Sequence, residues 1–223
     1  MCGRFTLRTP SNVLVTQFQL AVDPQLPLRF NIAPTQSVAV VRQTIADSPR
    51  ELAMLHWGLI PSWAKDPKMG ARMINARAET VAEKPSFRAA FQRRRCLVLA
   101  DGYYEWQSTG GRTKQPYYIR RRDDAPFAMA GLWEHWPKGD PPIESCTVIT
   151  TAANDLTRPI HDRMPVILNE ADYARWLDAD LEDAGALLMP QEERTLRADC
   201  VSTHVNRPAN DDPRCIEVQR ELF

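Results

Sequence analysis

The 223-residue sequence predicts a single α+β domain over residues 1–223, with a curved, mostly antiparallel, β-barrel-like core and peripheral helices. Three observations support this fold class. Strand-length apolar stretches outnumber helical ones. The two kinds of element do not alternate strictly, which argues against a doubly wound parallel sheet. Eighteen prolines enforce frequent turns, and many short strands favour closure toward a barrel.

The expected strands are stretches rich in β-branched or aromatic residues and bounded by Pro, Gly or Asp. In chain order they cover residues 37–43, 52–59, 96–106, 116–121, 126–133 and 146–153. Four further segments have helical patterns, and the first follows Pro10 with Ser11 as its N-cap. These helices are expected over residues 11–19, 84–94, 169–179 and, more weakly, 180–188. We find no linker that would divide the chain.

The composition is that of a soluble globular protein, with 43% hydrophobic and 25% charged residues. No apolar run approaches the ~20 residues that span a bilayer, and the first residues do not resemble a signal peptide. We therefore expect a soluble protein that does not enter membranes and is cytoplasmic, or nuclear if its source is eukaryotic. The net charge of zero argues against a uniform polyanion coat, but it leaves room for a local basic groove.

The five cysteines, at positions 2, 96, 146, 200 and 215, include no Cys-x-x-Cys pair. This spacing predicts neither a structural zinc site nor a disulfide framework, and we expect no metal and no cofactor. Cys96 and Cys146 lie in apolar runs and are expected to be buried small hydrophobic residues.

Cys2 stands at a position where removal of Met1 would give it a free α-amine beside its thiol. Both groups are nucleophiles near neutral pH. A 1,2-aminothiol can condense with an aldehyde to an imine and then close a five-membered ring. Alternatively, the thiolate can attack an amide while the amine acts as a base. The competing interpretation is an inert cysteine at a frayed terminus.

Two internal motifs combine polar side chains with small or aromatic neighbours. In "MINARAET", residues 73–80, Asn75, Arg77 and Glu79 would share one face of an extended segment, as in either a ligand site or a solvated edge strand that ends in a helix cap. In "LADGYYEWQ", residues 99–107, Glu105 lies between two aromatic residues. Desolvation there would raise the carboxyl pKa and suit acid–base catalysis, unless the side chain faces solvent on a hairpin.

Two further motifs carry a histidine and a pair of tryptophans. His161, in "RPIHDRMPVIL", stands beside Asp162 and Arg163 in a Pro-bounded loop, which suits either an acid–base group or a structural histidine. "HWGLIPSWAKD" places Trp57 and Trp63 around a Gly/Pro turn. Exposed aromatics there could stack on or wedge into nucleic acid, although burial of at least one tryptophan is expected.

Together these motifs resemble the SOS response-associated peptidase (SRAP) family, whose members process abasic sites in DNA. The resemblance covers nearly the whole chain in order. It departs at Pro61-Ser62-Trp63, where some relatives carry adjacent tryptophans. The motifs are "MCGRF", "RFNIAPTQ", "LHWGLIPSWAKD", "MINARAET", "LADGYYEW", "TTAAND", "IHDRMPVIL" and "VSTHVNRPANDDPRCIE".

The resemblance implies a monomeric protein whose partner is single-stranded or junction DNA containing abasic sites. It also implies a nucleoid association when DNA is bound and a stable thiazolidine DNA–protein crosslink at Cys2. The implied catalytic residues are Cys2, Asn75, Glu105 and His161. The implied DNA-binding residues are Arg4, Arg77, Trp63, Arg163 and Asn31, the last as a residue that shapes the pocket.

Two other functions remain open from the sequence. One is an N-terminal-cysteine thiol peptidase that acts on its own leader or on another substrate. The other is a binder of modified DNA without catalysis, which would need only the arginine and tryptophan features.

Overall fold

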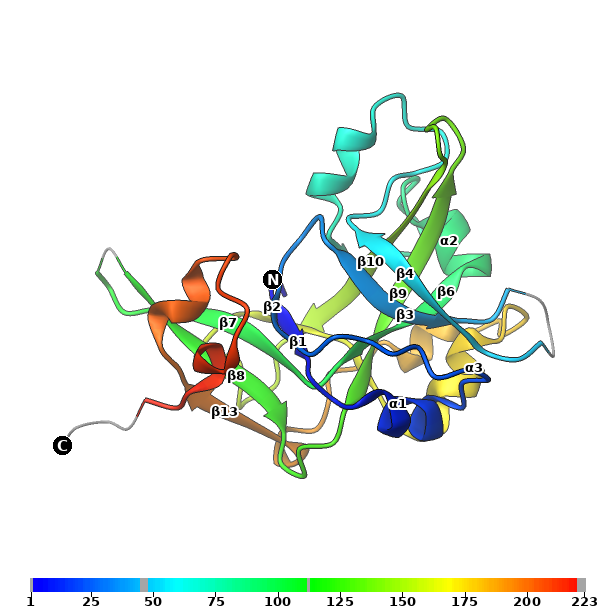
Figure 1. The fold of residues 1–223 in the computed structure, drawn as a ribbon. Coiled ribbons are helices and arrows are strands. Elements are labelled where there is room, and N and C mark those ends of the chain that lie inside the picture. Colours follow the sequence, from blue (N-terminus) through cyan, green and yellow to red (C-terminus); the bar gives the residue numbers. More distant parts are fainter. Residues whose placement is uncertain (1, 45–47, 112, 220–223) are drawn as a thin grey trace.

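The computed structural model describes residues 2–44, 48–111 and 113–219, and it contains two sheets (Figure 1). The smaller sheet has the strand order β13–β8–β7–β1–β2. Its neighbouring strands are antiparallel. Their bounds are Phe5–Leu7 for β1, Arg29–Ile32 for β2, Gly102–Ser108 for β7, Lys114–Arg121 for β8 and Leu196–Cys200 for β13.

The larger sheet closes on itself. β10 pairs with β4 in parallel, antiparallel pairings then lead from β4 through β3 and β6 to β9, and β9 pairs back to β10. These five strands form a barrel, which confirms the predicted fold class. Strands β5, β11 and β12 extend the sheet. The bounds are Ser37–Arg42 for β3, Glu51–Trp57 for β4, Asn75–Arg77 for β5, Arg95–Ala100 for β6, Phe127–Trp136 for β9, Ile143–Ala152 for β10, Arg163–Pro165 for β11 and Ile167–Leu168 for β12.

The stretch 96–106, expected as one strand, is two strands in different sheets. The chain leaves the barrel at Asp101, a buried residue between β6 and β7. Its carboxylate accepts hydrogen bonds from Thr6 Oγ1 at 2.5 Å and from the backbone N–H of Arg8 at 2.6 Å. A buried carboxylate needs such donors. These hydrogen bonds therefore fix Asp101 in place where the chain crosses from one sheet to the other.

The helices are short and lie outside the barrel (Figure 1). Ser11 is the first residue of α1 and Pro10 is its N-cap, so the predicted cap at Ser11 is wrong by one position. The Ser11 hydroxyl instead accepts a hydrogen bond from Leu26 N at 2.9 Å. The bounds are Ser11–Phe18 for α1, Arg88–Arg93 for α2 and Tyr173–Leu177 for α3.

Six short 3₁₀ helices complete the described elements. The weak helix expected over 180–188 is only a 3₁₀ turn, Ala184–Leu187, with Gly185 inside it. Glycine costs about 1 kcal/mol relative to alanine in a helix, which disfavours a longer α-helix here. The bounds are Pro67–Arg72 for η1, Glu170–Asp172 for η2, Ala184–Leu187 for η3, Glu193–Thr195 for η4, Thr203–Asn206 for η5 and Pro213–Ile216 for η6.

The core explains the apolar stretches of the sequence. Every residue of β6 is buried, because one face of the strand lines the barrel and α2 and α3 cover it from outside. Cys96 and Cys146 are fully buried, as expected. Arg95, also buried, donates to the carbonyls of Phe91 and Trp176, at 2.7 and 2.8 Å, and thereby joins both helices to the barrel.

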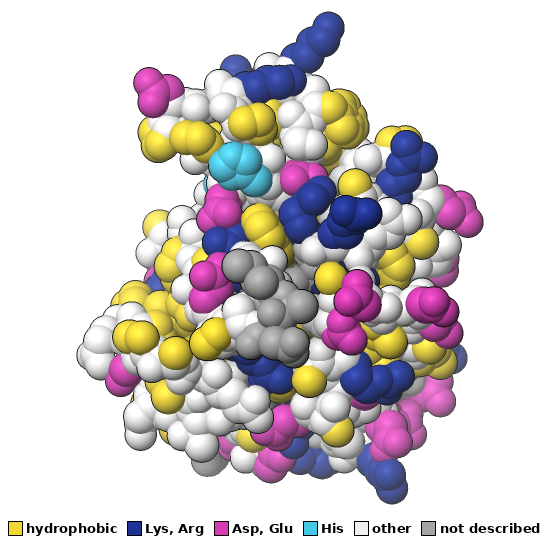
Figure 2. Space-filling view, turned by 90° about the vertical axis from the view of Figure 1, so that its right-hand side faces the viewer, with side chains coloured by type: hydrophobic (Ala, Val, Ile, Leu, Met, Phe, Trp, Pro, Cys, Tyr) yellow, Lys and Arg dark blue, Asp and Glu magenta, His cyan; other side chains and the backbone are white. Residues whose placement is uncertain are grey.

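The surface carries charges of both signs. On the face shown in Figure 2, Lys and Arg side chains are interspersed with Asp and Glu, and no continuous basic stripe crosses its described atoms. Among the described residues, no helix has both the length and the apolar character that crossing a bilayer requires.

Candidate functional site

Strand β1 brings the N-terminal segment to β7 (Figure 1). The two strands are antiparallel, with Phe5 opposite Tyr103, and the N–H of Tyr104 donates to Arg4 O at 2.9 Å. Extending this register places Gly3 beside Glu105. The preceding residue, Cys2, is fully buried, so the thiol is packed into the protein and does not lie at a frayed end.

Asn75 holds the same segment from the barrel side. It begins β5, which pairs with β10 in parallel, and it lies opposite Val148. Its Nδ2 donates to the carbonyl oxygen of Cys2 at 2.8 Å. Its Oδ1 is buried and accepts no hydrogen bond from any residue that the structure describes. Since a buried amide oxygen without a donor is costly, this oxygen is an acceptor available beside Cys2.

Burial dominates the ionisation of the two reactive groups. It raises the pKa of the Cys2 thiol far above its usual range, and the negative charge of Glu105 raises it further. Burial also raises the pKa of the Glu105 carboxyl, which the charge of His161 opposes and that of Asp162 reinforces. The thiol therefore favours its protonated form, and a carboxyl whose pKa is raised by burial is a better proton donor and acceptor than an exposed one.

His161 follows a turn that starts at Thr157, whose carbonyl accepts the His161 N–H at 3.0 Å. The Nδ1 atom of the ring accepts the N–H of Arg163 at 3.0 Å. Because a backbone N–H can only donate, this contact favours a hydrogen on Nε2, whereas the carboxylate of Asp162 near the same atom favours one on Nδ1. Asp162 Oδ1 lies 2.9 Å from Nδ1, and this approach becomes an ion pair only when the ring is protonated.

A cavity of about 420 Å³ adjoins these groups, and Trp106 forms part of its wall. The guanidinium of Arg4 lies 5.8 Å from the centre of the Trp106 ring, a distance at which a cation and an aromatic ring attract. Cationic and aromatic groups therefore line a space that Glu105 and His161 also reach. The lining residues are Arg4, Glu105, Trp106, Lys114, His161 and Asn206.

Three other predicted residues, Arg77, Arg163 and Trp63, do not line this cavity, and they differ in exposure and pairing. Arg77 is exposed and forms no ion pair within the described ranges. Arg163 is occupied, because its two terminal nitrogens bind the Glu79 carboxylate at 2.5 and 2.8 Å. Trp63 is 53% exposed, whereas Trp57 is fully buried and donates its Nε1–H to Ile74 O.

Asn31 is fully buried, and its side chain forms hydrogen bonds with the segments packed around it. Its Nδ2 donates to three carbonyl oxygens of the C-terminal segment, at 2.7 to 3.1 Å. Its Oδ1 accepts from Arg4 Nη1 at 2.9 Å. Asn31 thus shapes the wall of the cavity and does not itself reach the surface. The three carbonyls belong to Val205, Arg207 and Asn210.

Sequence reasoning assigned no role to four residues of the site. Trp106 lies in "LADGYYEWQ" and Asn206 in "VSTHVNRPANDDPRCIE", but nothing in either motif indicated a role for these two residues. Lys114 stood in no motif, and only the pairing of β8 with β7 brings it to the cavity. The hydroxyl of Tyr103 is buried and lacks a hydrogen-bond partner in the described chain. Burial raises the pKa of Tyr103, and negative charge on Cys2 or Glu105 raises it further. The Tyr103 hydroxyl is therefore close enough to interact electrostatically with both groups.

Comparison with known proteins gives a consistent result. The sequence profile of the family described as "SOS response associated peptidase (SRAP)" matches residues 1–208. The chain is 43% identical to the Abasic site processing protein YoqW of Bacillus subtilis, over 97% of this chain and 99% of that protein. It is 39% identical to the Abasic site processing protein HMCES of Xenopus tropicalis, over 76% of this chain and 58% of that protein.

Solved structures support the fold. A crystal structure of a protein from Bacteroides thetaiotaomicron superimposes with a TM-score of 0.86 at 28% identity, over 98% of this chain and all of that one. A protein from Bordetella bronchiseptica superimposes with a TM-score of 0.76, over 90% of this chain and all of that one, also at 28% identity.

Proposed function

Because the chain belongs to the SOS response associated peptidase (SRAP) family, and its relatives are named abasic site processing proteins, we propose that it processes abasic sites in DNA. In this proposal the aldehyde of an abasic sugar reacts with Cys2 and remains attached to the protein. The observation that carries it is the burial of Cys2 against Asn75 and Glu105 beside a cavity with cationic walls. The crosslink shields the lesion from strand cleavage.

The reaction needs the α-amine of Cys2, which removal of Met1 exposes; Met1 lies outside the described residues. The amine nitrogen adds to the aldehyde carbon, and the resulting hydroxyl leaves as water to give an imine. The imine nitrogen keeps its hydrogen, and the sulfur bonds to the imine carbon while the thiol proton passes to Glu105, which regains the proton that it gave to the departing hydroxyl. A thiazolidine results, and one water molecule is released overall.

Each catalytic residue has a task that fits its surroundings. Protonated Glu105, whose pKa burial raises, donates the proton that the departing hydroxyl needs and then accepts the thiol proton. His161 helps to open the closed sugar. The Oδ1 of Asn75 accepts from the Cys2 amine and orients its lone pair, so that the reactants meet in a productive geometry.

DNA binding in this proposal depends on phosphate contacts, which give affinity without reading sequence. Arg4 and Arg77 contact phosphates, and Arg163 joins them when DNA displaces Glu79. Trp63 stacks on a base of a single strand or wedges into a junction. Lesion selectivity follows from the aldehyde itself. We further propose that the protein acts as a monomer in the cytoplasm and on the nucleoid, without a cofactor.

The proposal is tested with Met1-free protein and an oligonucleotide that bears one abasic site. We expect a heat-resistant adduct on a denaturing gel, with an intact mass equal to protein plus DNA minus one water. Cys2→Ser should abolish it. An alanine inserted before Cys2 should also abolish it, because the thiol and the amine then belong to different residues. A stable adduct with the insertion variant, or none with the wild type, would contradict the mechanism.

One observation favours peptidase chemistry as a second candidate: the Cys2 thiol lies in the field of a carboxyl with a raised pKa. Such a pair could release a leader that precedes Cys2. Expression in a host without its general methionine aminopeptidase tests this idea by mass spectrometry. Self-processing predicts that the wild type loses Met1 and that Glu105→Gln retains it, whereas retention in both variants rules it out.

A further inference from the structure

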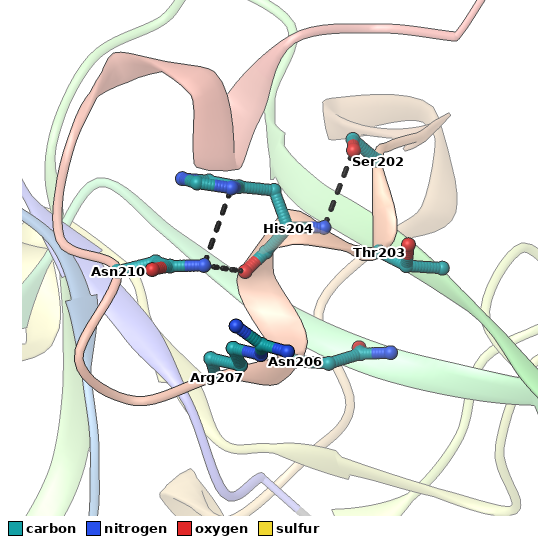
Figure 3. A pocket seen from close by; sticks show the side chains of 6 residues that line it. All are labelled: Ser202, Thr203, His204, Asn206, Arg207 and Asn210. Carbon is teal, nitrogen blue, oxygen red and sulfur yellow. Dashed lines mark hydrogen bonds between the residues drawn. The ribbon is translucent and has the colours of Figure 1, made fainter.

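A second cavity lies next to the candidate site, in the C-terminal segment around η5 (Figure 3). Its volume is about 500 Å³. Every lining side chain can donate a hydrogen bond, and none is an acid, which is the composition expected for an anion site. The lining residues are Ser202, Thr203, His204, Asn206, Arg207 and Asn210.

The two cavities share a wall. Asn206 lines both of them, and its Oδ1 accepts the Nε1–H of Trp106 at 2.7 Å. This bond occupies the oxygen of the amide and leaves its N–H groups for a ligand. An extended ligand that leaves the cavity of Glu105 and His161 past Trp106 would therefore enter the second cavity directly.

The second cavity is held in shape before any ligand arrives. Arg4 Nη1 donates to Val205 O at 3.0 Å, and the three bonds from Asn31 fix the same segment. Asn210 Nδ2 donates to His204 O at 2.7 Å and contacts the ring at Nδ1 at 3.2 Å; Figure 3 shows this amide pointing at His204. Preorganised donors bind an anion with little ordering cost.

Arg207 supplies the positive charge. Its side chain is exposed, and its guanidinium forms no ion pair or hydrogen bond with any residue in the described ranges. The nearby Arg214 differs, because it binds Asp212 at 2.8 Å. Arg207 therefore keeps all five N–H donors available, and a guanidinium recognises phosphate through two parallel hydrogen bonds.

A metal site explains the region less well. Donor atoms of His204, Asp212 and Cys215 lie within 4.8 Å of one another. However, both Asp212 oxygens are engaged, by Arg214 and by His204 Nε2, and the Cys215 sulfur donates to a backbone oxygen at 3.3 Å. Burial raises the pKa of that thiol, which disfavours the thiolate that a metal needs. The cluster instead orients His204.

We propose that this second cavity binds the phosphodiester group next to the lesion on the same DNA strand, through Arg207, Asn206 and the hydroxyls of Ser202 and Thr203. The proposal rests on the proposed function, since it adds a phosphate subsite to the same binding path. It also assigns the conformation of segment 202–210 a role in DNA binding and not only in folding.

The test measures affinity for a single-stranded oligonucleotide with a tetrahydrofuran residue at its centre. This abasic analogue lacks the aldehyde, so reversible binding is followed by fluorescence anisotropy without a crosslink. Arg207→Gln should weaken binding by about fivefold to tenfold, the size of one charge-assisted contact. The control is Arg88→Gln on α2, also exposed and without an ion pair among the described residues, which should bind as the wild type does.

A second series replaces each phosphate flanking the analogue, one at a time, with a neutral methylphosphonate. One replacement should weaken wild-type binding by about the same factor and should have little further effect on Arg207→Gln. Equal losses in both proteins at every position would overturn the proposal, as would unchanged affinity of Arg207→Gln or no DNA binding at all. If this coupling holds but authentic abasic DNA forms no adduct with the wild type, the subsite stands and the crosslinking function fails.

Discussion

At the scale of single residues, the site depends on how burial changes Cys2 and Glu105. A thiol at a chain terminus would ordinarily be solvated, but β1 carries Cys2 into the core next to a carboxyl that is 4% exposed. Burial raises the pKa of both groups, and the negative charge of Glu105 makes ionisation of the Cys2 thiol still less favourable. The Cys2 thiol is thus kept protonated, and in the proposed mechanism the amine of Cys2 is therefore the group that attacks the aldehyde first.

Replacing Glu105 with glutamine should change how stability depends on pH. Because burial raises the pKa of Glu105 above its ordinary value of 4.5, the folded protein loses stability as pH rises from that value through the raised pKa. Glu105→Gln removes this loss. In urea unfolding, the free energy of unfolding of the variant relative to the wild type should therefore be higher at pH 8 than at pH 4.

The exposed Glu83→Gln serves as a control for loss of one negative charge, and its difference from the wild type should stay small at both pH values. A Glu105→Gln advantage that did not grow with pH would show that the carboxyl is not destabilised in its ionised form. Its role as proton donor and acceptor would then lack support.

At the scale of elements, the site is made where the chain passes from β6 in the barrel to β7 in the smaller sheet. β7 contributes Glu105 and Trp106, β1 beside it brings Cys2, and β5 at the barrel edge brings Asn75. The crossover at Asp101 therefore sets how the two sheets present their groups to one another.

Gly102, the first residue of β7, tests this crossover. A Cβ atom there would lie 2.3 Å from the ring of Tyr118, and the ring is fully packed in the core. We expect Gly102→Ala to lower the free energy of unfolding by about 1–3 kcal/mol, as overpacking does, and to reduce adduct formation by displacing β7. Gly111→Ala is the matched control, because its nearest neighbour would be 3.8 Å away. Equal stability of the two variants, measured in urea, would contradict this view of the crossover.

At the scale of the whole molecule, a net charge of zero coexists with a positive centre. Many surface arginines are neutralised by carboxylates, for example Arg42 by Glu51 and Arg121 by Asp123. In contrast, Arg207 at the second cavity and Arg77 at the end of β5 form no ion pair within the described ranges. In the proposed function, the distribution of charge, and not its sum, is what favours DNA binding.

DNA binding should therefore depend on salt as it does for a basic protein. Four proposed phosphate contacts, by Arg4, Arg77, Arg163 and Arg207, predict a slope of about −3 for the logarithm of the association constant against the logarithm of salt concentration on single-stranded DNA. Anisotropy titrations of the tetrahydrofuran oligonucleotide between about 50 and 200 mM salt measure this slope. A slope near zero would show that these cations do not contact phosphates.

Much of the fold and several site residues could be predicted from the sequence. The short β-rich stretches indicate the barrel-like class because apolar runs of strand length must be buried wherever they pair. Cys2, Asn75, Glu105 and His161 stand in motifs whose chemistry is legible residue by residue. The resemblance through those motifs gives the family.

Only the tertiary structure decided how these residues meet. The division of 96–106 at Asp101, the burial of Cys2 and the internal role of Asn31 depend on contacts between segments far apart in the chain. The same is true of the cavity at Arg207, whose shape depends on bonds from Arg4 and Asn31. A local sequence pattern indicates whether a segment is a strand or a helix and which chemical groups it holds. It does not indicate which distant donor, charge or ring will lie beside it, because that depends on how the two sheets pack.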